Sequence, residues 1–219
     1  MKLFLDSAKT DEIQHAHQVW NVDGITTNPK HVQSSGKTFR TAIEEIATLL
    51  AGTDKPISVE VNPHLTDWKD IVRQGRELAE ISPNFVIKVG VSEGGCRAIH
   101  ELAGQGVRVN ATLIFCVPQA WHAARAGAAF VSPFLGWREQ YGDPASTLVR
   151  DVRRMLDVGG YPAQIIAAAI RSSFQIGEAA VAGAHCVTAG FSVYQESFVN
   201  PYTTMGEGVF QNAWDGTPK

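Results

Sequence analysis

The sequence contains only three cysteines, Cys96, Cys116 and Cys186, and no two of them form a C-x-x-C pair. A zinc site needs closely spaced ligands and a disulfide framework needs paired cysteines, so we expect neither. The histidines are also scattered without ligand spacing. We therefore expect no bound metal, and thiols that stay reduced in the cytoplasm.

Long hydrophobic runs and a strong charge of one sign are also missing. No apolar run approaches the roughly 18 residues of a membrane span, and the first one, KLFL, becomes polar too early for a secretion signal. The net charge is only −3, which indicates neither a nucleic-acid nor a membrane partner. The 219 residues, 44% of them hydrophobic, suffice for the core of a single domain over 1–219. Because membrane, secretion and nucleic-acid signals are missing, we expect a cytoplasmic protein that binds small molecules.

Short β-type runs alternate with segments of helical length along the chain. Eight strands are predicted at 2–6, 24–26, 57–61, 85–89, 107–114, 128–134, 163–169 and 185–190. The helices that follow them are predicted at 10–20, 37–50, 66–81, 92–103, 118–126, 144–156, 172–181 and 192–199. Strands rich in Val, Ile and Ala without alternation are typical of a parallel sheet covered by helices.

Eight such units predict an α/β fold closed into a single (β/α)8 TIM barrel, with a helical tail at about 201–219. An open, doubly wound sheet is the alternative. No GxGxxG motif opens the first helix, which weakens a dinucleotide-binding interpretation.

Lys88 lies in the middle of the fourth predicted strand, in the stretch NFVIKVGVS. Burial strongly disfavours the charged form of lysine, so a lysine among apolar neighbours is expected to lose proton affinity. The free amine can then attack a carbonyl as a nucleophile. A structural role alone would not explain why a lysine is buried here.

Other polar residues fall where the predicted strands end, which is where barrel enzymes carry their catalytic groups. They are Asp6, Thr26, Asn28, Glu60, Asn110, Thr112, Ser132 and Arg171. Taken singly, several of them could be turn or cap residues. A core built only for stability would not collect them, because each unpaired buried polar group costs roughly 1–3 kcal/mol. Together with Lys88 they indicate Schiff-base chemistry on a sugar, with no cofactor.

Six motifs resemble those of the small bacterial-type transaldolases and fructose-6-phosphate aldolases. They are LFLDSA, GITTNPK, IKVGVSEGG, VNATLIF, SPFLGW and AAAIRS, and they run collinearly from Met1 to about Trp214. The resemblance implies that Lys88 forms the Schiff base with a ketose, that Asp6 is the base for carbon–carbon cleavage, and that Glu60 and Thr112 hold a water that shuttles protons. The substrate-binding residues that it implies are Asn28, Asn110, Ser132 and Arg171. Four further residues in or beside the same motifs are expected to bind the substrate with them: Thr26, Phe134, Trp137 and Arg138.

The family has two branches, which differ around the shuttling water. The resemblance to the transferase branch is the closer one, since this chain has Glu60 and Phe134 where the free aldolases have glutamine and tyrosine. Asn110 and Ser132 also follow the transferases. We therefore expect a transaldolase, with an aldolase that releases free dihydroxyacetone as the alternative.

The chain departs from the family where the phosphate of the substrate would bind. Trp137 replaces an arginine, with Arg138 beside it, and Ala169 replaces a serine, while Arg171 is retained. Either Arg138 swings in to bind a phosphate, or the substrate carries a sulfonate, whose single negative charge needs fewer cations. Both a sugar phosphate and a 6-sulfofructose stay open as substrates. Lys30 and His31 also replace small and apolar residues after TTNP and are candidates to face the mouth of the site.

Further alternatives concern catalysis and assembly. A non-catalytic sugar-binding or scaffold barrel is one alternative. A deoxyribose-phosphate-type aldolase is another, but it would be expected to carry a second lysine close to Lys88, and no predicted strand offers one there. In the tail, Phe210 and Trp214 share one helical face. They would pack either on the barrel's own helices or, as the resemblance suggests, against another subunit in a homo-oligomer of five or ten copies.

Overall fold

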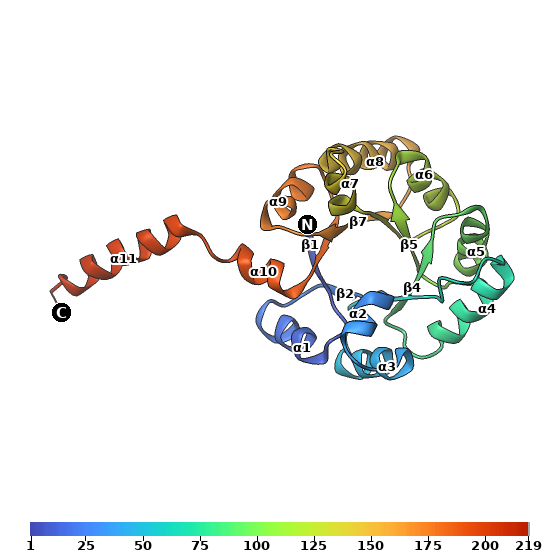
Figure 1. Ribbon diagram of the computed structural model, residues 1–219, viewed down its shortest axis with the longest axis horizontal. Coiled ribbons are helices and arrows are strands. Elements are labelled where there is room, and N and C mark those ends of the chain that lie inside the picture. The colour runs from blue at the N-terminus through green and yellow to red at the C-terminus, as the bar shows by residue number, and fades with distance from the viewer. Residues whose placement is uncertain (219) are drawn as a thin grey trace.

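Eight parallel strands pair in chain order and close into a barrel in the computed structural model of this chain, which describes residues 1–218 without the side chains of 145 and 146 (Figure 1). The ring closes where Leu3 pairs with Val187. The strands are β1 (Lys2–Asp6), β2 (Gly24–Thr26), β3 (Ile57–Glu60), β4 (Phe85–Gly90), β5 (Val109–Ile114), β6 (Phe130–Pro133), β7 (Gln164–Ile170) and β8 (Cys186–Ala189). The predicted (β/α)8 barrel is confirmed, and the open sheet is wrong.

Helices surround the barrel, as the repeating pattern predicts (Figure 1). They are α1 (Thr10–Val19), α3 (Phe39–Leu49), α4 (Trp68–Ala79), α5 (Glu93–Gly104), α6 (Val117–Arg125), α8 (Ala145–Gly159), α9 (Ser173–Val181) and α10 (Phe191–Ser197). Two six-residue helices were not predicted, α2 (Pro29–Ser34) after β2 and α7 (Leu135–Gln140) after β6. Within residues 1–218, none of the helices has the length and apolar character needed to cross a membrane.

The barrel interior is built in layers, because alternate side chains of each strand point inward. One layer is an apolar cluster made by Phe4, Val86, Phe130, Ile166 and Cys186. The inward side chains two residues further along the same strands include Asp6, Lys88, Ser132 and Thr188. The apolar layer therefore seals the barrel directly below a polar layer at the carboxyl ends of the strands.

Two strands are irregular where they reach this polar layer. The register of β5 shifts between Ala111 and Ile114, and that of β7 between Ala167 and Ile170. Leu113 and Ala169 lie at these bulges with φ of 61° and 57°, a left-handed conformation that is costly for residues with a side chain. Such bulges re-aim side chains next to active sites. Both residues accordingly line the cavity described below.

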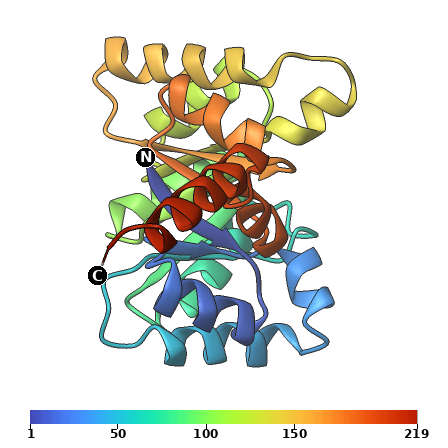
Figure 2. The ribbon, with the colours of Figure 1, turned by 90° about the vertical axis from the view of Figure 1, so that its left-hand side faces the viewer.

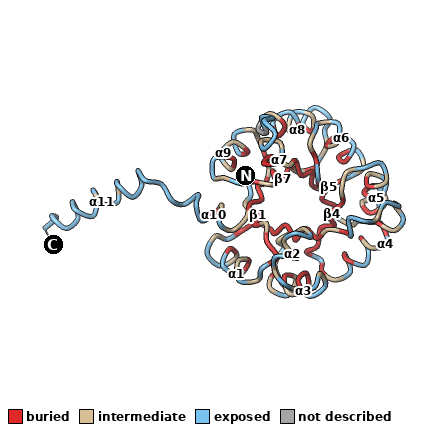
Figure 3. Tube along the Cα trace, in the orientation of Figure 1, coloured by how far each residue is buried: buried red, intermediate tan, exposed pale blue. Residues whose placement is uncertain are grey.

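Helix α11 (Pro201–Asp215) extends away from the barrel in Figure 1, and in Figure 2, where that side faces the viewer, it lies in front of the barrel. The preceding helix α10 is anchored, since the Tyr194 hydroxyl donates to the Phe4 carbonyl oxygen at 2.8 Å. In contrast, the described part of α11 has no buried residue, and Figure 3 shows it exposed along its length. Phe210 and Trp214 are 76% and 70% exposed, so packing on the barrel's own helices is wrong for this tail.

Candidate active site

A cavity of about 410 Å³ opens at the carboxyl ends of the strands. Every predicted site residue except Arg138 lines it: Asp6, Thr26, Asn28, Glu60, Lys88, Asn110, Thr112, Ser132, Phe134, Trp137 and Arg171. They come from seven of the eight strands or the segments that directly follow them. The fold thus brings together side chains that are spread over most of the chain.

Lys88 lies at the bottom of this cavity and is only 4% exposed. Its Nζ atom donates to the Thr27 carbonyl oxygen at 3.1 Å and lies 3.4 Å from Oε2 of Glu60. The pairing register places Glu60 and Asn110 directly beside Lys88 on the two neighbouring strands. The amine is therefore buried and held in one place, with one face toward the cavity.

Glu60 and Thr112 form a candidate proton-transfer pair on the two strands next to β4, with Glu60 opposite Lys88 and Thr112 opposite Gly90. Burial raises the pKa of the Glu60 carboxyl above its usual range, and the Lys88 ammonium opposes this only in part. The buried Thr112 Oγ1 atom has no hydrogen-bond partner among the described residues. A buried hydroxyl without a partner costs free energy, so Thr112 is suited to bind a ligand or a water in the cavity.

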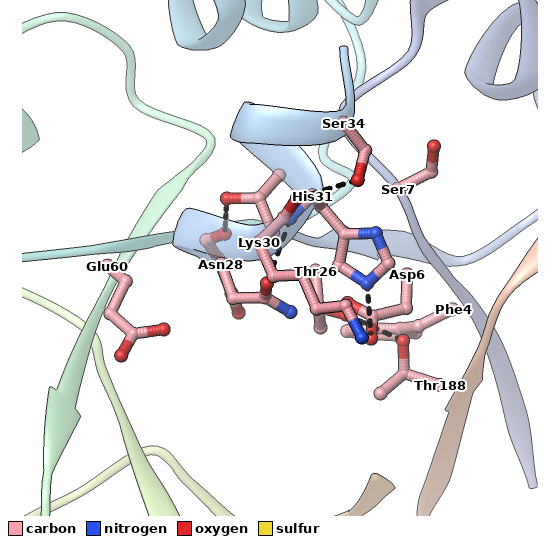
Figure 4. A network of polar contacts seen from close by, with 12 residues as sticks. Phe4, Asp6, Ser7, Thr26, Asn28, Lys30, His31, Ser34, Glu60 and Thr188 are labelled. Atoms are coloured by element: carbon pink, nitrogen blue, oxygen red, sulfur yellow. Dashed lines mark hydrogen bonds and ion pairs between the residues drawn. The ribbon is translucent and has the colours of Figure 1, made fainter. Parts of the chain in front are cut away.

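Asp6 is the centre of a second polar cluster, drawn in Figure 4. Its Oδ1 atom accepts from the Thr26 hydroxyl at 2.7 Å, and Thr26 in turn lies 2.7 Å from the Thr188 hydroxyl. Its Oδ2 atom lies 3.0 Å from Nε2 of His31. Burial acts to raise the pKa of Asp6, but the hydrogen bond and charge of His31, together with Lys88 and Thr26, outweigh it and hold that pKa below the ordinary value.

A third set of contacts orients amide groups for hydroxyl recognition. The Ser132 hydroxyl donates to Oδ1 of Asn110 at 2.7 Å, and Nδ2 of Asn110 donates to Oγ of Ser58 at 3.1 Å. Asn28 caps α2, because its Oδ1 accepts from the His31 backbone N–H at 3.0 Å. The amide Nδ2 of Asn28 is then the group left to donate to a ligand.

Aromatic rings form the wall of the cavity next to β6. Trp137 stacks on Phe115 with ring centroids 6.0 Å apart and meets Phe134 edge-on at 5.6 Å. Helix α7, which carries Trp137, approaches β7 closely because Gly136 has no side chain: a Cβ there would lie 2.3 Å from the Ala169 carbonyl oxygen. The tryptophan lines the cavity and is nevertheless 47% exposed.

The two arginines expected at this end are placed differently. Arg171 lines the cavity, and its Nη1 atom donates to Oε1 of Gln140 at 3.2 Å. The Nε atom of Arg138 lies 3.6 Å from Oδ2 of Asp143, and Arg138 is not among the residues that line the cavity. Arg138 therefore does not take the place of the missing arginine in this structure.

Sequence reasoning missed Thr188, Ser58 and Phe115, and it noted His31 only as a candidate for the mouth. Thr188 and Ser58 are inward positions of strands, two residues from Cys186 and Glu60, so alternation could have identified them. Phe115 follows a bulge, which breaks that alternation.

Comparisons with known proteins agree with this geometry. The family model described as Transaldolase/Fructose-6-phosphate aldolase matches residues 3–214. The chain is 48% identical to a 6-deoxy-6-sulfo-D-fructose transaldolase of Priestia megaterium, over 99% of this chain and 96% of that protein. It is 38% identical to a probable transaldolase of Streptococcus agalactiae serotype V, over the whole of both chains.

Proposed function

The chain belongs to the transaldolase/fructose-6-phosphate aldolase family, and from this premise we propose that it transfers a dihydroxyacetone unit from 6-deoxy-6-sulfofructose to an aldehyde such as glyceraldehyde 3-phosphate. The observation that supports the proposal most is the buried amine of Lys88, 3.4 Å from Glu60 and in one cavity with Asp6. A buried strand lysine between two carboxylates suits covalent catalysis on a ketone.

The reaction follows from the positions of these groups. Lys88 Nζ attacks the ketone carbon, and Glu60 with Thr112 moves the protons needed to expel water and form the imine. Asp6 takes the proton of the C4 hydroxyl, the C3–C4 bond breaks, and its electron pair moves to the iminium nitrogen to give an enamine and a free aldehyde. The enamine then attacks the acceptor aldehyde, Asp6 returns its proton to the new hydroxyl, and water releases the product from Lys88.

Transfer is favoured over simple release because the enamine is poorly placed to be protonated. The cavity residue Phe134 has no hydroxyl, and the rings beside it are those of Trp137 at 5.6 Å and Phe115 at 5.9 Å. A tyrosine at this position would offer an acidic proton. The three-carbon unit is therefore expected to remain on Lys88 until an acceptor aldehyde arrives.

The tail of the substrate is proposed to be a sulfonate because the cavity has few cations at that end. Arg171 is the arginine that lines it, while Arg138 faces Asp143. A phosphate carries nearly two charges and prefers a bidentate clamp of several donors, whereas a sulfonate carries one. The guanidinium of Arg171 and the indole N–H of Trp137 match the smaller charge, and the relative in Priestia megaterium is named for a sulfonated ketose.

We expect the wild-type protein to have a higher kcat/KM for 6-deoxy-6-sulfofructose than for fructose 6-phosphate, and to need an acceptor aldehyde for rapid turnover. Trp137→Arg should shift the ratio of the two kcat/KM values toward fructose 6-phosphate by roughly 10- to 100-fold, since a charged hydrogen bond contributes about 1.5–3 kcal/mol. The measurement is parallel steady-state kinetics on both ketoses with glyceraldehyde 3-phosphate present.

Trp137→Phe is the matched control, because it keeps an aromatic ring on Phe115 but removes the indole N–H. It should lower kcat/KM for the sulfonate without a gain for the phosphate. An unchanged ratio in Trp137→Arg would contradict the assignment of this wall to the anionic tail.

We also propose that α11 packs on another copy of the chain, in a homo-oligomer of five or ten subunits. Its exposed apolar residues are Tyr202, Met205, Val209, Phe210 and Trp214. Their helical spacing makes one apolar face, and an apolar surface of this kind on a soluble enzyme marks an interface.

The triple change Val209→Ser, Phe210→Ser and Trp214→Ser should therefore convert the assembly into smaller species, as measured by light scattering after size-exclusion chromatography. Gln211→Ser, on the same helix but outside the apolar set, should leave the mass unchanged. An assembly of equal mass in the triple variant would argue against a role for α11 in it.

For its location we propose the cytoplasm. The thiols of Cys96, Cys116 and Cys186 are all free within the described residues. Burial raises the pKa of the Cys186 thiol to about 11, so this thiol is inert rather than redox-active. Unpaired thiols and a substrate that meets sugar phosphates both suit a reducing compartment.

A further inference from the structure

His31 is a polar residue of the cavity that the proposed reaction does not use. It lies on the short helix α2, which begins at Pro29 directly after the Asn28 cap. The His31 backbone N–H is held by Oδ1 of Asn28 at 3.0 Å, and the imidazole reaches down to Asp6. Figure 4 shows the ring above Asp6, with a dashed line marking the contact between them. Backbone and side chain are thus both fixed.

Both oxygens of Asp6 are occupied by neighbours from different elements. The Thr26 hydroxyl of β2 donates to Oδ1 at 2.7 Å, and Nε2 of His31 lies 3.0 Å from Oδ2. A carboxylate only accepts hydrogen bonds, so Nε2 of His31 carries the proton that is shared. Rotation of the carboxylate about its own axis would break at least one of these bonds. Thr26 and His31 therefore fix the plane of the carboxylate.

The charge of Asp6 depends on the same contact. The other titratable groups that face Asp6 are Lys88 from β4, Glu60 from β3 and the Tyr194 hydroxyl from α10. Burial favours a neutral Asp6, and the charge of Asp6 in turn helps to raise the pKa of Glu60. Burial raises the pKa of Tyr194, so its hydroxyl stays uncharged near neutral pH. His31 and Lys88 are the cationic groups on the other side of this balance. The charge on the Lys88 nitrogen changes along the proposed reaction, since the attacking amine is neutral, the iminium is cationic and the enamine is neutral again. His31 forms no bond in these steps and is therefore the constant partner.

We propose that His31 is a positioning residue that holds the Asp6 carboxylate ionised and in one orientation, so that a free lone pair points into the cavity toward the substrate hydroxyl. This rests on the proposed function, in which Asp6 is the base of carbon–carbon cleavage. His31 acts through Asp6 and does not contact the bond that breaks. The imidazole is 30% exposed, whereas the Asp6 side chain is 18% exposed, so the ring also shields the carboxylate from water.

Two variants at this position separate orientation from charge. His31→Leu removes the donor and keeps an apolar side chain of similar length. His31→Gln keeps a neutral N–H donor near the position of Nε2. We expect the leucine variant to release the first aldehyde on the order of 10- to 100-fold more slowly in a single turnover, because a misplacement of about 1 Å can cost 10²-fold. The glutamine variant should recover most of this loss.

The pH profile gives a readout that a purely structural role would not move. Loss of the His31 contact raises the pKa of Asp6, since burial is then opposed by fewer groups. The acid limb of kcat/KM should therefore move to higher pH in His31→Leu, and less far in His31→Gln. Trapping of the ketose on Lys88 by borohydride should persist in both variants, because imine formation relies on Glu60 and Thr112.

These outcomes distinguish the two proposals. A wild-type protein that borohydride does not trap would refute the proposed function itself. Normal trapping, with wild-type cleavage rate and acid limb in His31→Leu, would overturn only the role of His31. Should the leucine variant fail to fold, as judged by circular dichroism, the glutamine variant decides: an acid limb identical to that of the wild type overturns the proposal, and an upward shift supports it.

Discussion

We expect Lys88→Met to abolish turnover and covalent trapping together. Methionine has nearly the length of lysine but no amine, so no imine can form with the ketose. Removal of the nucleophile from a catalytic unit costs on the order of 10⁴-fold or more in kcat. With the ketose and borohydride, the mass of the wild-type protein should increase by one reduced sugar, and the mass of the variant should not change.

The fold should tolerate this change, because the strand around Lys88 is apolar. Val86, Ile87 and Val89 are all buried, and the lysine is 4% exposed. The change would destabilise the protein mainly at Glu60, because its carboxylate would lose the Lys88 ammonium group 3.4 Å away. Breaking one side of a buried ion pair can cost 3–5 kcal/mol, but Glu60 already has a raised pKa and can become neutral. The double variant Lys88→Met/Glu60→Gln should therefore be at least as stable to heat as Lys88→Met alone.

Lys30 supplies the matched control for trapping, since it is a second lysine that lines the cavity, but an exposed one. Lys30→Met should still be trapped, with the modified peptide containing Lys88. Trapping at Lys30 in the wild type, or persistent trapping in Lys88→Met, would contradict the assignment of the nucleophile. A protein that is never trapped would favour the interpretation as a sugar-binding barrel.

The barrel and the position of its lysine could be predicted because they depend on patterns that extend over many residues. Eight apolar runs separated by segments of helical length predict an eight-stranded barrel, and Lys88 is identified because it is the one charged residue in the apolar run FVIKV. Glu60 and Asn110 were predicted as strand residues of the site, and the structure adds that they lie directly beside Lys88 in the strand register. These predictions need only the polarity of neighbouring residues and the two-residue alternation of side chains along a strand.

The contacts of the cavity mouth could not be predicted, because they depend on short elements. Helix α2 has six residues, too few for a helical period, and its start at Pro29 looks like a turn in the sequence. The pairing of His31 with Asp6, 25 positions away, exists only once α2 folds over β1. Arg138 was expected at the anion site because it lies next to Trp137, yet Asp143 attracts it elsewhere. Adjacent residues on a short helix, such as Trp137 and Arg138, can have side chains that point to different places.

Asp6→Asn should separate the two halves of the reaction. Asparagine has the same shape, and its oxygen can still accept from Thr26 at the position of Oδ1, now 2.7 Å away. The amide N–H₂ would face His31, whose Nε2 can become an acceptor when the proton moves to Nδ1. The network therefore survives, but asparagine cannot accept the proton of the C4 hydroxyl.

Since a general base contributes typically 10²- to 10⁴-fold, kcat for Asp6→Asn should fall by about that factor while borohydride still traps the ketose on Lys88. The measurement is release of the first aldehyde in a single turnover, followed next to the fraction of protein trapped. Asp70→Asn is the control, an equal change on the outer surface of α4 where Asp70 only pairs with Arg73, and it should turn over like the wild type. Loss of trapping along with turnover in Asp6→Asn would assign Asp6 to imine formation. Turnover within a few-fold of the wild type would require another base, for which His31, 3.0 Å from Oδ2 of Asp6, is the candidate.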